Sequence, residues 1–285
     1  MTGTTAVRRT VVVDGVRTSY LEAGQGPPLL LLHGGEFGGG AEVCWERVLP
    51  GLAQRHRVIA PDLLGFGETD KLIDFVDGRG RRIAHLAAFC RLLDLHDVVV
   101  VGNSMGGMLA LFDAAREHPV LPAAGIVSLA GGGRLQSSEH TDALFDYDGS
   151  MEGMRRIVRA LFAGPEWPAD TGYVQRRHAS SIAPGAWEAV AAARFRRPQP
   201  EGEPAQSEQI PAAPRSGMDY AAIAVPTLLV AGAEDKLKPA GWADEVCALI
   251  PGSRREVVPG AGHCPQIEAV DATLPILLEC AAALR

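Results

Sequence analysis

The sequence lacks the features that mark nucleic-acid-binding, disulfide-rich and membrane-spanning proteins. It has no basic arm or stripe, and its formal net charge is −7, so nothing concentrates positive charge against phosphates. Its five cysteines form no CxxC pair, and five is an odd number, which argues against a disulfide framework or a zinc ribbon. No apolar run approaches the roughly 18 residues that a transmembrane helix needs. We therefore expect no nucleic acid, membrane or metal, and a small molecule as the partner.

The first ten residues, MTGTTAVRRT, are polar and lack the apolar core of a secretory signal peptide. The cysteine usage also suits a reducing compartment. The expected location is the cytoplasm.

What the sequence does contain is enough apolar material for a full core, since 47% of its 285 residues are hydrophobic. Residues 10–22 contain two β-type runs around Asp14-Gly15, a dipeptide that favours a tight hairpin. Further apolar runs show no alternation, which is typical of parallel strands buried on both faces. These runs are residues 29–32, 57–60, 98–101, 125–129, 227–230 and 256–258.

Helical patterns fall between most of these runs, and the alternation predicts an α/β fold, a mostly parallel doubly wound sheet after an antiparallel hairpin. The patterns cover residues 46–54, 83–95, 105–117 and 241–249. The interval between the runs 125–129 and 227–230 is too long for a loop, and it predicts a mostly helical cap.

We expect a core domain of residues 1–133 and 221–285 with a cap of residues 134–220. Within the cap, residues 151–162 and 173–181 are helical in pattern. Residues 198–214 are rich in Pro, Glu and Gln and poor in apolar anchors, and they should be the most mobile segment.

A nucleophile motif joins the run VVVV to the following helix. Gly102-Asn103-Ser104-Met105-Gly106 has the form G-x-S-x-G, and its small residues allow a sharp strand-to-helix turn that exposes the Ser104 hydroxyl. The alternative is a glycine-rich turn that merely contains a serine. In this architecture the N–H of Met105, at the helix start, belongs to the oxyanion hole.

The second oxyanion donor is expected just after residues 29–32, where the sequence reads His33-Gly34-Gly35-Glu36. The N–H of Gly35 is the candidate. His33 invites a catalytic interpretation, but it directly follows a buried strand, and a role in bracing the loop is favoured.

A base and an acid follow the nucleophile in the order that this fold requires. His263 lies in a glycine-rich turn after the last run. Four other histidines lie far from the carboxyl ends of strands and a fifth lies in the cap; the four are His56, His85, His96 and His118, and the fifth is His140. Glu234 and Asp235 both follow residues 227–230, and spacing favours Asp235 as the acid. Asp62 is a rival by context, but it precedes the nucleophile, and we interpret it as a structural turn residue.

With these motifs in place, nearly the whole chain resembles the α/β-hydrolase family. Within it the chain is most similar to the meta-cleavage product hydrolases, serine enzymes that cleave a carbon–carbon bond next to a ketone. Two of the similar stretches lie in the expected cap. The stretches are VIAPDLLGFGETD, VVGNSMGG, SMEGMRRIVRALF, VQRRHASSIAPGAWEA and GAGHCPQIE.

The resemblance implies further substrate contacts. Asn103 and Arg177 match residues that contact the dienolate and carboxylate end of the substrate, with Arg176 as the competing choice for the arginine, and Gly34 belongs to the same loop as Gly35. A guanidinium suits a carboxylate. Cys264 stands where the family commonly has Trp, and we expect it in the pocket wall.

The oxyanion loop also differs from the family, because it reads Gly-Gly-Glu-Phe-Gly-Gly-Gly in place of a run that usually contains Gly-Pro-Gly. The resemblance implies no metal or organic cofactor, and it implies a homodimer or higher homo-oligomer.

The expected function is hydrolysis of a C–C bond next to a ketone in a small carboxylate-bearing substrate. The first alternative is an esterase, lactonase or thioesterase with the same triad. The second is a protein of this fold that binds or isomerises a ligand without hydrolysis.

Overall fold

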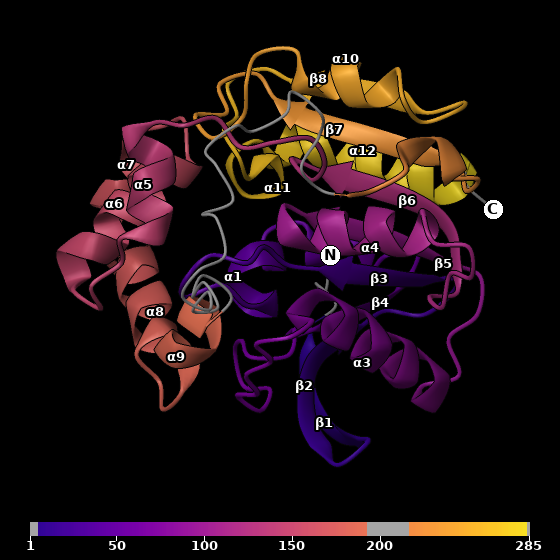
Figure 1. The fold of residues 1–285 in the computed structure, drawn as a ribbon, viewed down its shortest axis with the longest axis horizontal. Coiled ribbons are helices and arrows are strands. Elements are labelled where there is room, and N and C mark those ends of the chain that lie inside the picture. The colour runs from indigo at the N-terminus through magenta and orange to yellow at the C-terminus, as the bar shows by residue number, and fades with distance from the viewer. Residues whose placement is uncertain (1–4, 193–216, 284–285) are drawn as a thin grey trace, which may run out of the picture.

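An eight-stranded sheet forms the centre of the computed structural model, which describes residues 5–192 and 217–283 (Figure 1). The strand order is β1-β2-β4-β3-β5-β6-β7-β8. The pairs β1/β2 and β2/β4 are antiparallel and all other pairs are parallel. The strands are β1 Val7–Val13, β2 Val16–Ala23, β3 Pro28–Leu32, β4 Arg57–Pro61, β5 Val98–Asn103, β6 Ala123–Leu129, β7 Thr227–Gly232 and β8 Arg254–Val258.

The predicted hairpin is confirmed. Val13 pairs with Val16, and the two residues between them, Asp14 and Gly15, have φ angles of 48° and 81°. Both angles lie in the left-handed region that the tight turn requires. All six predicted apolar runs are also strands, so the expected α/β sheet is correct.

The parallel strands divide their side chains between two apolar layers, which explains their unbroken hydrophobic character. Leu30 and Leu32 of β3 face one layer, and Leu29 and Leu31 face the other. The first layer contains apolar side chains from α3, α4 and α10, and the second contains side chains from α1, α2 and α12. These helices are α1 Ala41–Trp45, α2 Leu49–Leu52, α3 Gly78–Leu92, α4 Met105–Ala114, α10 Trp242–Cys247 and α12 Val270–Ala283.

The prediction of one helix over residues 46–54 is wrong, because only the short helix α2 lies in this range and α1 ends just before it, at Trp45. Glu46 and Arg47 lie in the turn between them. Pro50 is the second residue of α2. Proline has no N–H and is accepted in the first helical turn but not in a helix interior, so a helix begins rather than continues at this point.

Between β6 and residue 192, where the first described part of the chain ends, five helices lie to one side of the sheet, beyond the carboxyl ends of its strands (Figure 1). We call α5–α9 the cap helices. The predicted helices 151–162 and 173–181 are confirmed as α6 and α8, whereas the segment 198–214 lies outside the described residues. The cap helices are α5 Glu139–Phe145, α6 Met151–Leu161, α7 Glu166–Ala169, α8 Thr171–Ser181 and α9 Ala186–Ala191.

Two short elements complete the described chain, the 3-10 helix η2 Tyr220–Ala222 before β7 and α11 Pro265–Glu268 after β8. Within residues 5–192 and 217–283, none of the helices combines the length and the apolar character needed to span a bilayer.

Candidate active site

Ser104 occupies the sharp turn between β5 and α4. Its backbone angles are φ 49° and ψ −112°, and a non-glycine residue in such a region costs on the order of 1–3 kcal/mol. The turn is held by two hydrogen bonds, from Ser104 N–H to Leu129 O (2.8 Å) and from Met108 N–H to Ser104 O (2.9 Å). The neighbouring strand and helix thus hold Ser104 in a strained backbone conformation that presents its hydroxyl.

The glycines on both sides of Ser104 are required by close backbone approach. A Cβ atom on Gly102 would lie 2.3 Å from Gly107 N, and one on Gly106 would lie 2.1 Å from Leu32 O. No side chain fits at either position without moving backbone. This is why the motif needs small residues two positions before and after the serine.

The variant Gly106→Ala should lose about 1–3 kcal/mol in free energy of unfolding, since the added methyl group overpacks a backbone contact. Denaturant unfolding measures this loss. The matched control is Gly172→Ala, which adds the same methyl group to an exposed position of α8 with its nearest neighbour at 3.4 Å. The control should gain about 0.5–1 kcal/mol from the higher helix propensity of alanine. Equal stability of the two variants would contradict the account of the turn.

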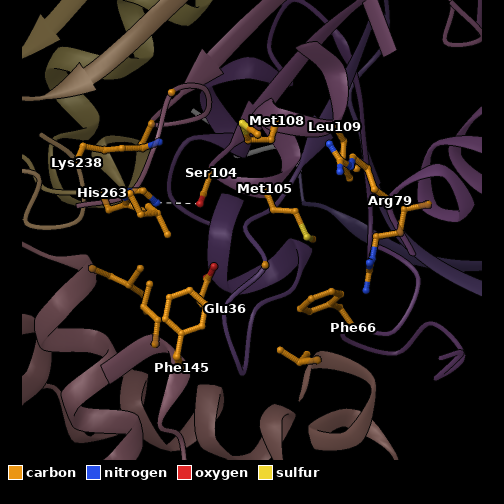
Figure 2. Close-up of a pocket in the computed structure, with 18 residues that line it drawn as sticks. Glu36, Phe66, Arg79, Ser104, Met105, Met108, Leu109, Phe145, Lys238 and His263 are labelled. Carbon is orange, nitrogen blue, oxygen red and sulfur yellow. Dashed lines mark hydrogen bonds between the residues drawn. The ribbon is translucent and has the colours of Figure 1, made fainter. Parts of the chain in front are cut away.

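His263 and Asp235 come from the loops after β8 and β7 and meet at Ser104 (Figure 2). His263 Nε2 lies 2.8 Å from Ser104 Oγ, and His263 Nδ1 lies 2.8 Å from Asp235 Oδ2. The His263 and Asp235 side chains are 2% and 3% exposed. Since the carboxylate can only accept, Nδ1–H donates to Asp235 and Nε2 is available to accept from Ser104.

Asp235 is held as a carboxylate in spite of its burial. Burial alone raises the pKa of Asp235. The His263 ring and the N–H of Leu237 lower it by more than burial raises it, so the pKa of Asp235 lies below its ordinary value. Its rival Glu234 is exposed and makes no contact with the histidine. The structure thus places Asp235, rather than Glu234, against His263.

The two other polar residues considered for catalysis hold the chain in place. His33 Nδ1–H donates to Gly34 O (2.6 Å), and Nε2 accepts from Leu63 N–H (2.9 Å). Asp62 accepts from the N–H of Ala41 at 2.8 Å and is paired with Arg8 at 2.9 Å. Burial lowers the pKa of His33, which keeps its ring neutral. Both residues therefore have the structural roles that the sequence favours.

The expected oxyanion donors lie side by side. A Cβ atom on Gly35 would lie 2.6 Å from Met105 Sδ, and both residues line the cavity next to Ser104. Met105 is the first residue of α4, so its N–H has no acceptor within the helix. Gly35 and Met105 thus both lie in the cavity wall at Ser104, and their N–H groups remain the expected oxyanion donors.

A cavity of about 510 Å³ opens in front of Ser104, between the sheet and the cap helices. Most of its wall is apolar, and the polar part consists of four charged side chains together with Ser104 and His263. In Figure 2, Glu36 points into the cavity, with Lys238 toward one end and Arg79 toward the other. The lining residues are Gly35, Glu36, Phe66, Arg79, Arg82, Ser104, Met105, Met108, Leu109, Ala130, Gly133, Leu135, Leu144, Phe145, Leu161, Val190, Lys238 and His263.

Three of the expected substrate contacts lie behind this wall instead of in it. Asn103 is 1% exposed, and its amide donates to the backbone oxygens of Leu129 (3.2 Å) and His263 (3.0 Å). Cys264 is also 1% exposed and lies against Asn103, and Gly34 lies under the Glu36 carboxylate. Asn103 thus supports the histidine loop from behind. Burial raises the pKa of Cys264 well above its ordinary value, so its thiol stays protonated and unsuited to nucleophilic attack.

Arg177, the fourth expected contact, is also absent from the cavity wall. It is 1% exposed and donates to Glu36 Oε1 (2.6 Å) and to the Tyr173 hydroxyl (3.1 Å). The competing Arg176 lies on the outside of the cap, 51% exposed, and pairs with Glu46. The difference from expectation has a physical cause, because an internal carboxylate already occupies the guanidinium of Arg177.

Sequence reasoning missed Glu36, Lys238, Arg79 and Arg82 as cavity residues. The signal for Glu36 was present, since a glutamate interrupts the glycines of the oxyanion loop. The arginines and the lysine carry no such signal, because their positions in the cavity follow from the packing of α3 and of the loop after β7.

Lys238 is a buried cation close to the Asp235–His263 pair. It is 6% exposed, donates to Gly132 O, and lies 4.9 Å from the Trp242 ring centre. Burial lowers its pKa to about 8, and Asp235 only partly offsets this effect. The protein therefore holds this ammonium at a cost in stability at neutral pH.

Replacing Lys238 by Met should raise the free energy of unfolding at pH 7 by about 1–3 kcal/mol, from the scale of 1.4 kcal/mol per pKa unit. The unfolded chain keeps its proton up to about pH 10.4, whereas the folded protein releases it near pH 8. Between these two pH values the unfolded chain binds the extra proton, so the free energy of unfolding of the wild type increases with pH. The difference in stability between Lys238→Met and the wild type therefore shrinks as the pH rises. Unfolding curves at pH 7 and pH 9.5 test both signs, and an advantage that grows with pH would contradict the prediction.

The end of α6 is attached to the loops that carry the acid and the base. Leu161 O accepts from His263 N–H (2.8 Å), and Phe162 O accepts from Lys236 Nζ (2.6 Å). The Glu268 carboxylate accepts from the N–H groups of Ala163 (2.7 Å) and Gly262 (2.5 Å). We call these contacts the α6 anchor.

Comparison with known proteins gives a consistent set of matches. Residues 27–270 match the family described as alpha/beta hydrolase fold. A 2-hydroxy-6-oxo-6-(2'-aminophenyl)hexa-2,4-dienoic acid hydrolase of Metapseudomonas resinovorans is 34% identical over 92% of this chain and 86% of its own. A 2-hydroxy-6-oxo-2,4-heptadienoate hydrolase of Pseudomonas putida is 32% identical over 92% of this chain and 91% of its own.

Solved structures agree with these sequence relatives. A serine hydrolase involved in carbazole degradation has a TM-score of 0.79 and 31% identity, covering 99% of this chain and 100% of its own. A meta-cleavage product hydrolase from Pseudomonas fluorescens has a TM-score of 0.82 and 26% identity, covering 97% of this chain and 98% of its own.

Proposed function

Because the chain belongs to the α/β-hydrolase fold family and its sequence relatives are named as hydrolases, we propose that it cleaves a C–C bond next to a ketone, with Ser104, His263 and Asp235 as its triad. The observation that carries this proposal is the continuous pair of 2.8 Å contacts from Ser104 to His263 and from His263 to Asp235. The substrate is a small molecule of the meta-cleavage product kind, as the names of the relatives suggest.

The geometry supports a two-step reaction. Ser104 Oγ adds to the ketone carbon while its proton passes to His263 Nε2, and the N–H groups of Gly35 and Met105 hold the resulting oxyanion. In a 2-hydroxy-6-oxo-dienoate this cleavage requires the keto tautomer, in which the proton of the 2-hydroxyl has moved to the carbon next to the ketone. The C–C bond then breaks, its electron pair passes into the conjugated dienolate, and His263 returns its proton to the dienolate oxygen. Water attacks the acyl group on Ser104 with His263 as base, which releases the acid and restores the serine.

An ester, lactone or thioester is the second candidate substrate. The specific observation in its favour is Glu36, which lies in the cavity wall and occupies Arg177, the residue expected to receive the substrate carboxylate. The same triad performs both reactions, because only the leaving group differs. Ligand binding without hydrolysis is disfavoured by the complete set of contacts at Ser104.

A substrate panel separates these candidates. Purified protein is tested with 2-hydroxy-6-oxo-dienoates that carry different C6 groups and with p-nitrophenyl esters of two to eight carbons. We expect dienoate turnover to exceed ester turnover in kcat/KM. Ester turnover alone would favour the second candidate, and absence of turnover together with absence of labelling by a fluorophosphonate would reject both.

A further inference from the structure

The cavity carries a carboxylate on the same side as the expected oxyanion donors. Glu36 lines the cavity next to Gly35, and its side chain is 8% exposed. Its Oε2 atom lies over Gly34, where a Cβ atom would come within 2.3 Å. A substrate bound at Ser104 therefore meets a carboxylate oxygen on this wall.

Glu36 is also the counter-ion of Arg177. Its Oε1 accepts from Arg177 Nη2 at 2.6 Å, and the side chain of Arg177 is 1% exposed. The guanidinium is further held by the Tyr173 hydroxyl at 3.1 Å and by Phe37 O at 3.5 Å. Burial raises the pKa of Glu36, but the charge of Arg177 outweighs burial and lowers it overall, so the pair is ionic.

Separating this pair would be costly, because each partner would be left as an unpaired charge in a buried site. Arg177 does not line the cavity, and its Nη2 is already bonded to Glu36, so a substrate carboxylate in the cavity meets Glu36 and not the guanidinium. That carboxylate would lie close to the Glu36 charge, and juxtaposed like charges cost several kcal/mol. Binding of an anionic group against this wall is therefore unfavourable, because the repulsion from Glu36 is not offset by a contact with Arg177.

Resting on the proposed serine-hydrolase function, we propose that Glu36 determines charge specificity by excluding a carboxylate from the Gly34–Gly35 side of the cavity. The substrate group bound there is uncharged and donates a hydrogen bond to Glu36, as a hydroxyl or amide does. A carboxylate of the substrate is therefore kept away from this side of the cavity.

The test uses a matched pair of esters, p-nitrophenyl hydrogen glutarate and its methyl ester, which differ only in the charge of the distal group. In the wild-type protein kcat/KM should favour the methyl ester at least about tenfold. In Glu36→Gln this preference should fall at least about tenfold, mainly through KM for the anion. A preference that changes less than twofold would overturn the proposal.

The matched control is Glu46→Gln, which makes the same charge change in a Glu–Arg pair with the same 2.6 Å contact on the outer surface. The kcat/KM preference of Glu46→Gln for the methyl ester over the anionic ester should equal that of the wild type. A shift in the control as large as that in Glu36→Gln would show a general charge effect and would also overturn the proposal.

A second measurement needs neither turnover nor a stable Glu36 variant. Calorimetry on Ser104→Ala protein gives Kd for both esters without hydrolysis, and the methyl ester should bind at least about tenfold more tightly. Equal Kd values, or tighter binding of the anion, would reject the role of Glu36. Failure of the proposed function has a different signature, namely no turnover and no phosphonate labelling at Ser104 of the wild type.

Discussion

Replacing Ser104 by alanine is expected to lower kcat by a factor on the order of 10⁴ to 10⁶. The reason is that the structure offers His263 no other hydroxyl at hydrogen-bonding distance within the described residues, and the oxyanion donors alone cannot supply a nucleophile. Substrate binding should persist, because removing Oγ leaves the cavity wall intact. Steady-state turnover and substrate Kd, measured on the same preparation, give the two numbers.

Ser137→Ala is the control for this experiment, since Ser137 is exposed in the loop before α5 and does not line the cavity. It should keep wild-type kcat. Retention of more than a tenth of wild-type kcat by Ser104→Ala would eliminate the serine mechanism, whereas loss of binding in that variant would point to a change in structure.

The second large effect is expected at the buried pair of Arg177 and Glu36. Arg177→Met should lose about 3–5 kcal/mol in free energy of unfolding, because Glu36 remains as an unpaired buried charge. The double variant Arg177→Met/Glu36→Gln should recover most of this loss. The surface variant Arg176→Met removes an exposed partner of Glu46 and should lose at most about 1 kcal/mol.

The loss in Arg177→Met depends on pH in a defined direction. Without the arginine, burial raises the pKa of Glu36 above its unfolded value of about 4.3, so the folded variant takes up a proton as the pH falls and its penalty shrinks. In the wild type the pKa of Glu36 is lowered. Its ionised form therefore stabilises the folded protein at pH values above the pKa of the unfolded chain, and this stabilisation is lost as the pH falls. Denaturant unfolding should show a larger difference in free energy of unfolding between the wild type and Arg177→Met at pH 7.5 than at pH 5. An equal difference at both pH values, or full additivity of the two substitutions in the double variant, would contradict the coupling of Arg177 and Glu36.

The sheet and the meeting of Ser104, Asp235 and His263 could be predicted from the sequence, because each depends on short local patterns. The three residues all follow apolar runs, and parallel strands bring their carboxyl ends to one edge of the sheet. Their order along the chain favours the roles that we propose for them. The elbow glycines add a steric requirement, since a Cβ atom on Gly102 or Gly106 would meet backbone atoms.

The substrate side of the cavity could not be predicted in the same way. Glu36 and Arg177 are separated by 141 positions, and only the packing of the cap on the core brings them together. Asn103 and Cys264 flank the nucleophile and the base in sequence, but successive residues of an extended chain point to opposite sides. Asn103 and Cys264 are therefore placed behind the wall, where they support the site.

The α6 anchor constrains how the protein can exchange ligand and product. Leu161 and Phe162 hydrogen-bond to the loops of His263 and Asp235, so this end of the cap cannot swing away without displacing both. The far end of the cap is held as well, because Arg177 of α8 is paired with Glu36 of the core. The acid and the base are thus positioned by the cap as well as by the edge of the sheet.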